Sequence, residues 1–162
     1  INICIYIYCI GGIIFMSYLN SYDVLHVKGC ACGNLRKTTR VITQFYDKIL
    51  QPTGLRSTQF SLLTNILVHE NISVSELGVK LLMDQTTVTR NIEILRKKGY
   101  ITVTKEDDDS RRKSISITND GEKKLEEAIP LWEVAQSKIE QGIGVENFQE
   151  FLKTLNYIQN LI

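Results

Sequence analysis

The most informative part of the chain is residues 73–121, which read SVSELGVKLLMDQTTVTRNIEILRKKGYITVTKEDDDSRRKSISITNDG. Ser73 and Glu76 have the spacing of a capping box, in which hydroxyl and carboxylate each accept a hydrogen bond from an unpaired amide. The sequence therefore predicts a short helix that opens near residue 73. Asp84 is a preferred N-cap residue, and it predicts a second helix that ends at Gly99.

After this helix the apolar period changes from 3.6 to 2, which is typical of strands. Isoleucine and valine alternate with threonine over 101–104, and isoleucine alternates with serine over 114–117. The intervening residues 106–113, EDDDSRRK, contain no apolar side chain and indicate a charged loop. The order helix, tight turn, helix, strand, charged loop, strand predicts a winged helix-turn-helix.

Four further helices are expected from apolar residues at helical spacing. They cover about 33–50, 57–69, 120–140 and 145–162, with Ser57 or Thr58 and Asn119 as helix caps and a kink at Pro130. The expected fold class is mainly α (α+β), with a small antiparallel wing and a helical dimerisation lobe. The side chains expected on the apolar faces of the last two helices are Leu125, Ala128, Ile129, Trp132, Ala135, Ile139, Phe148, Phe151, Leu152, Leu155, Ile158 and Ile162.

Charge is distributed unevenly along a chain of net charge +1. Residues 28–118 hold 15 of the 19 basic groups and 9 acidic ones, whereas residues 119–162 hold 4 basic and 8 acidic groups. A basic middle segment indicates a nucleic-acid partner for that segment.

The candidate DNA contacts lie on the second helix of the motif and on the wing. A major groove admits one helix, and hydroxyl, amide and guanidinium groups bind base edges and phosphates. The candidates are Gln85, Thr86, Thr87, Thr89, Arg90, Arg96, Arg111, Arg112 and Lys113. Taken singly, the threonine-rich helix start, the basic helix end and the charged loop could be only a capped helix start, a solvated basic face and a hairpin turn. Their occurrence together in this order favours DNA binding.

The chain resembles the MarR-type winged helix-turn-helix transcriptional regulators over about residues 30–162. The most specific part is Asp109-Ser110-Arg111 followed by ISITNDG at 115–121, which is similar to the wing of that family, with Ile117 in place of its usual leucine. The resemblance implies that Asp109 orders the wing and that Arg111 meets DNA. It also implies repression that is relieved by small phenolic or lipophilic compounds. The helices at about 33–50, 120–140 and 145–162 carry more apolar faces than one lobe can cover, so we expect a homodimer on a palindromic operator.

The expected domain organisation follows from this resemblance. Residues 1–27 form a poorly defined extension, and residues 28–162 form the MarR-type domain. Within it, 57–118 is the winged helix lobe, and 28–50 with 119–162 supplies the dimerisation helices. Residues 1–15 are interpreted as an upstream extension before a natural start at Met16; a hydrophobic anchor and a dimer-packing segment are the alternatives.

Two features suggest how the protein could respond to a signal. Cys30 and Cys32 are interpreted as small, partly buried residues, as redox-sensing thiols, or as metal ligands together with His26. A crevice between the lobes is expected to be lined by Phe45, Tyr46, Phe60 and Trp132, which suit a small aromatic or lipophilic ligand or simply form core.

Other functional classes have less support. With two distant histidines and no glycine-rich phosphate loop, nothing indicates an enzyme, a cofactor or a metal centre. A winged-helix protein-interaction module without DNA binding remains the alternative, against which the cationic wing argues. The four cysteines all lie in the first fifth of the chain, so no pair of them could form a disulfide across the domain, and we expect a cytoplasmic protein. We also expect no membrane partner.

Overall fold

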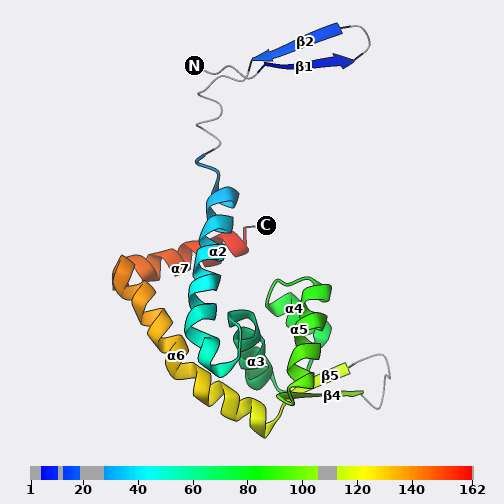
Figure 1. Cartoon of the computed structure of the whole chain (residues 1–162), viewed down its shortest axis with the longest axis vertical. Coiled ribbons are helices and arrows are strands. Elements are labelled where there is room, and N and C mark those ends of the chain that lie inside the picture. The colour runs from blue at the N-terminus through cyan, green and yellow to red at the C-terminus, as the bar shows by residue number, and fades with distance from the viewer. Residues whose placement is uncertain (1–4, 11–12, 19–27, 106–112, 162) are drawn as a thin grey trace. The chain divides into compact units, whose positions relative to one another are not determined.

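A computed structural model describes residues 5–10, 13–18, 28–105 and 113–161, with side chains for 28–104 and 114–161 (Figure 1). The chain divides into two compact units, Ile1–Ile42 and Thr43–Ile162. In the first, β1 (Ile5–Ile10) and β2 (Ile13–Tyr18) form an antiparallel hairpin with Ile10 opposite Ile13. Residues expected to be a poorly defined extension therefore include two strands, as their isoleucines and tyrosines favour. Among the described residues, no helix has the length and apolarity to span a bilayer.

Helix α2 (Ala31–Leu50) is followed by a short 3-10 turn (Gln51–Thr53) and by α3 (Ser57–His69). Pro52 and Gly54 follow the end of α2, and Gly54 takes the left-handed φ of 72° that glycine accommodates. The prediction that Ser57 or Thr58 caps α3 was wrong. Ser57 is already helical, and its amide and hydroxyl both donate to Asp47 Oδ1 at 2.7 Å. Asp47 therefore satisfies an amide that a local cap would otherwise bind.

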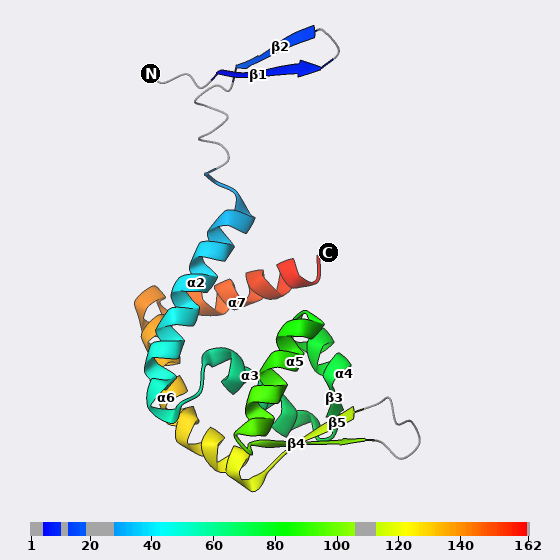
Figure 2. The same cartoon turned by 45° about the vertical axis from the view of Figure 1, so that its right-hand side comes forward.

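The helix-turn-helix is formed by α4 (Val74–Lys80) and α5 (Gln85–Lys97). The predicted capping box is confirmed, because Ser73 N–H donates to Glu76 Oε2 at 2.9 Å and Glu76 N–H donates to Ser73 Oγ at 3.1 Å. Asp84 is the N-cap of α5, also as predicted. The two helices stand side by side in both views of the chain (Figure 2).

The wing consists of β4 (Ile101–Lys105) and β5 (Lys113–Ile117), which pair antiparallel with Val103 opposite Ile115. The sequence analysis missed a third strand, β3 (Ile72–Ser73), which pairs with the other edge of β5 to give the order β3-β5-β4. A strand of two residues has no alternation to detect, so only its partner reveals it.

Helices α6 (Asn119–Ile143) and α7 (Val145–Gln159) follow the wing. Thr118, not Asn119, is the N-cap of α6: its Oγ1 accepts from Gly121 N–H at 3.1 Å and donates to the Gly99 carbonyl at 2.7 Å. A Cβ at Gly121 would collide with the Tyr100 carbonyl oxygen, which explains a glycine at this point of the motif. Pro130 lies inside α6, and the kink expected there remains a prediction.

The core lies between α3, α5, the sheet and the first half of α6. Leu63, Leu77, Val88 and Ile115 are completely buried there. Ile129 and Leu152, on the expected apolar faces of α6 and α7, are 42% and 43% exposed in the single chain.

Candidate nucleic-acid interface

Helix α5 is anchored by one apolar side and presents a polar one. Val88, Ile92 and Leu95 recur at helical spacing and are buried. The opposite face is exposed and carries four of the predicted contacts: Gln85, Thr86, Thr89 and Arg90. Since the buried side fixes the rotation of the helix, these four side chains have a defined direction with respect to the core.

The start of α5 is held by Asp84. Its carboxylate accepts a hydrogen bond from the Thr87 amide at 2.8 Å and another from the Thr87 hydroxyl at 2.6 Å. These bonds, the hydroxyl one first, lower the pKa of Asp84 below its usual range. The predicted site residue Thr87 is half-buried and uses its hydroxyl in the cap, so its role in this structure is to order the helix start.

At the far end of α5, Arg96 is bound by a carboxylate that the sequence analysis did not single out. Arg96 Nε and Nη2 donate to Glu93 Oε2 and Oε1 at 2.9 and 2.8 Å, and Lys97 Nζ lies 3.8 Å from Glu93 Oε1. The Arg96 hydrogen bonds lower the pKa of Glu93 and raise that of Arg96. The i, i+3 spacing of Glu93 and Arg96 was the available signal.

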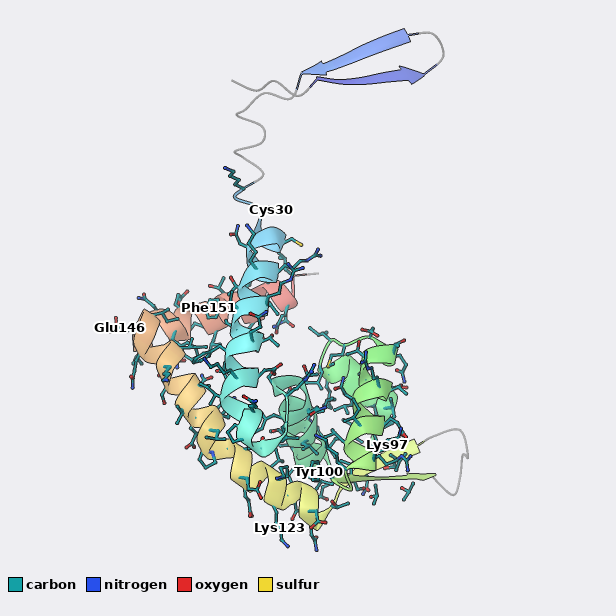
Figure 3. The ribbon with its side chains drawn as sticks, in the orientation of Figure 1. Cys30, Lys97, Tyr100, Lys123, Glu146 and Phe151 are labelled. Atoms are coloured by element: carbon teal, nitrogen blue, oxygen red, sulfur yellow. The ribbon has the colours of Figure 1, made fainter. Side chains whose placement is uncertain are left out.

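The junction between α5 and the wing is tied to the rest of the lobe. Lys97 and Tyr100 mark the point where α5 gives way to β4 (Figure 3). Between them, Lys98 Nζ donates to the Gly54 carbonyl at 2.8 Å, so this cation is directed at the protein. A hollow of about 460 Å³ separates α5 from β4, and it is lined by Val74, Thr89, Ile92, Glu93, Arg96, Val103 and Thr104.

The remaining predicted contacts belong to the wing loop. Asp109, Arg111 and Arg112 lie outside the described residues, and of Lys113 only the backbone is described, at the first position of β5. Their roles remain predictions.

A second hollow, of about 220 Å³, lies between α2, α3 and α6. It contains three of the four predicted crevice residues: Tyr46, Phe60 and Trp132. Phe60 stacks on Trp132 with ring centroids 6.1 Å apart, and Tyr46 Oη donates to Gln136 Oε1 at 2.6 Å. Burial raises the pKa of Tyr46. Phe45 is not among the residues that line this hollow; its ring lies nearly perpendicular to that of Tyr46, with ring centroids 6.0 Å apart.

Cys30 and Cys32 are exposed free thiols at the start of α2, not the partly buried residues of the first interpretation. Within the described part of the chain, no group of three or more His, Cys, Asp or Glu side chains is arranged to hold a metal ion.

A capped helix beside a two-stranded wing, with an exposed polar face on the helix, defines a winged helix-turn-helix protein of the DNA-binding class. A model of the MarR family matches residues 55–113. The chain belongs to the MarR family of transcriptional regulators, because relatives at 30% identity or more cover most of its length.

Three relatives illustrate the match. The HTH-type transcriptional regulator SarZ of Staphylococcus epidermidis is 30% identical over 125 residues, 77% of this chain and 76% of SarZ. The organic hydroperoxide resistance transcriptional regulator of Bacillus subtilis is 27% identical, over 69% of this chain and 76% of its own. The crystal structure of the M. tuberculosis regulator MosR matches with TM-score 0.73 and 31% identity, over 84% of this chain and 99% of MosR. The crystal structure of MosR in complex with DNA matches with TM-score 0.67 and 33% identity, over 81% of this chain and 98% of MosR.

Proposed function

We propose that the protein is a repressor that binds double-stranded DNA in a sequence-specific way and releases it on a chemical signal. The observation that carries the proposal is the exposed stripe of Gln85, Thr86, Thr89 and Arg90 on a helix whose opposite side is buried. The match to the DNA complex of MosR, at 33% identity, supports it.

The chemistry of this stripe suits base edges. Glutamine pairs with adenine through two hydrogen bonds, arginine does the same with guanine, and threonine serves either base. In the groove, the first turns of α5 would supply these groups, because the N-terminal residues of a recognition helix face the bases. Arg111, Arg112 and Lys113 on the wing would add contacts to the backbone or the minor groove.

Salt dependence of DNA binding tests this proposal. A duplex selected by the protein from a random-sequence library, and a shuffled duplex of the same composition, are titrated at several salt concentrations. We expect the affinity for the selected duplex to exceed the affinity for the shuffled duplex at every salt concentration. It should fall with salt at a logarithmic slope of about −0.9 per phosphate contacted. A protein-interaction module would select no duplex, and that result would end the proposal.

A homodimer on a palindromic operator is the assembly that we propose. Helices α6 and α7 leave large apolar side chains in water, which a second copy would cover. These side chains are Ile129, Val134, Ile143, Val145, Leu152 and Tyr157. A two-fold dimer would also space two α5 helices for half-sites about one helical turn apart.

The signal is a small aromatic or lipophilic ligand in the hollow formed by Tyr46, Phe60 and Trp132, or oxidation of Cys30 and Cys32. The hollow has an apolar wall and a phenol that can hydrogen bond, as ligand sites do. The exposed thiols, and the name of the hydroperoxide resistance relative, favour oxidation.

The two signals separate in one experiment. If thiols are the switch, peroxide releases DNA from the parent but not from the Cys30→Ser, Cys32→Ser variant. If the hollow is the switch, an aromatic carboxylate weakens DNA binding and peroxide has no effect. If neither acts, control by these two signals is excluded.

A further inference from the structure

The turn between α4 and α5 is closed by the two hydrogen bonds of a Schellman motif. Met83 N–H donates to the Gly78 carbonyl at 2.9 Å, and Leu82 N–H donates to the Val79 carbonyl at 3.2 Å. In this motif the residue that donates the inner, shorter-range bond adopts the left-handed conformation and is usually glycine. Here that residue is Leu82, with φ at 50°.

A leucine at this position is unfavourable for folding. In the left-handed region its Cβ approaches the following carbonyl oxygen, a contact that glycine avoids and asparagine tolerates. Packing does not compensate for it, because 75% of the Leu82 surface is exposed. Val79, three residues earlier, is exposed to the same extent. The fold alone would therefore favour glycine or asparagine at residue 82, and the leucine side chain contributes outside the core.

The position of Leu82 indicates what it meets. It precedes the cap Asp84 by two residues and the first proposed base contacts, Gln85 and Thr86, by three and four. It is therefore continuous with the part of α5 that would enter the major groove first. The Leu82 side chain has no hydrogen-bond donor or acceptor, so it cannot bind a phosphate or the polar edge of a base. The one apolar group that base pairs present in the major groove is the 5-methyl group of thymine.

We propose that Leu82 is a specificity-determining residue that packs on the 5-methyl group of a thymine beside the bases contacted by α5. This inference rests on the proposed DNA-binding function, and it adds an apolar thymine contact from the turn before α5 to the contacts of the helix itself.

Replacing thymine by deoxyuridine tests the contact, because it removes only the methyl group. The selected duplex is prepared with thymine and with deoxyuridine in both strands, and each is titrated with the parent. The variants are Leu82→Gly, which removes the side chain and the strain, and Leu82→Asn, which keeps the left-handed turn with a polar group. Val68→Ala is the control, since Val68 is a comparably exposed apolar residue on α3.

We expect deoxyuridine to weaken binding by the parent and by Val68→Ala about fourfold for each methyl group lost from the contact. Both Leu82 variants should lose less affinity on this exchange than the parent does, and Leu82→Gly should melt no lower than the parent. If deoxyuridine weakens all proteins to the same degree, or none, Leu82 faces something other than a thymine methyl and the inference is wrong. A clear loss of thermal stability in both Leu82 variants would also overturn it. Failure of the parent to select any duplex would instead reject the proposed function itself.

Discussion

Asp84 and Thr87 are joined by two hydrogen bonds, from the Thr87 amide at 2.8 Å and from its hydroxyl at 2.6 Å, to the two oxygens of one carboxylate. This pair fixes the first turn of α5, from which the proposed base contacts project. Order at the start of the helix is therefore a condition for reading DNA.

Replacing Asp84 by alanine should weaken DNA binding several-fold without unfolding the lobe, because the amides of the first turn lose their acceptor. Asp84→Asn retains an oxygen acceptor and is the matched control. Hydrogen exchange at the Thr87 amide should be faster in the alanine variant than in the asparagine variant. Equal exchange in both would show that the cap does not order this turn.

The same pair makes stability dependent on pH. The hydrogen bonds lower the pKa of Asp84 in the folded protein below its ordinary value of 3.8, so the unfolded chain binds the proton more readily. The stabilisation is therefore complete above the ordinary pKa and is lost as the pH falls through the lower folded value. Unfolding followed between pH 6 and pH 2 should show a smaller acid dependence for Asp84→Asn than for the parent.

Arg90→Ala should weaken binding to the selected duplex by about 1–3 kcal/mol if Arg90 contacts a base. Lys153→Ala is the control, because it removes a cation from the exposed surface of α7. Arg111→Ala should also reduce affinity, through the wing. If Arg90→Ala and Arg111→Ala both bound the selected duplex with the affinity of the parent, α5 and the wing would not be the DNA-binding surface.

Glu93→Gln should strengthen DNA binding and make it more dependent on salt. The change removes a negative charge from α5 and with it the ion pair that holds Arg96, so the logarithmic salt slope should steepen by about one phosphate contact. Glu150→Gln on α7 removes the same charge, 3.7 Å from Lys153, and should leave the slope unchanged. An identical slope in both variants would place Arg96 away from phosphates.

Leu152→Asp should weaken the proposed dimer, because it places a charge on an apolar surface that a second copy would cover. Light scattering at micromolar concentration should give the mass of a dimer for the parent and a lower average mass for this variant. Val68→Asp, on α3, should remain dimeric. A monomeric parent would contradict the assembly.

Trp132 is the one tryptophan in the chain, so its fluorescence reports directly on the hollow between α2, α3 and α6. An aromatic carboxylate such as benzoate should change this fluorescence in a saturable way and lower the affinity for DNA over the same concentrations. Phe60→Ala, which removes the ring stacked on Trp132, should weaken both effects. Fluorescence that saturates without a change in DNA binding would make the hollow a binding site but not a sensor.

The sequence by itself determined the features that depend on near neighbours. The Ser73–Glu76 capping box, the Asp84 cap and the period change at Gly99 involve residues within four positions of one another. Local hydrogen bonding and side-chain periodicity encode such features directly. They were sufficient to predict the winged helix-turn-helix and the exposed face of α5.

Tertiary structure decided what depends on distant partners. Ser57 is bound by Asp47 of the preceding helix, Ile72 becomes a strand only because Ile115 pairs with it, and the ring of Phe60 stacks on Trp132. The left-handed backbone of Leu82 belongs here too. Local preference would place glycine in that conformation, and the turn that contains Leu82 joins two helices that pack against each other, α4 and α5. Contacts of this kind form when chain closure and core packing bring residues together, and no local pattern records them.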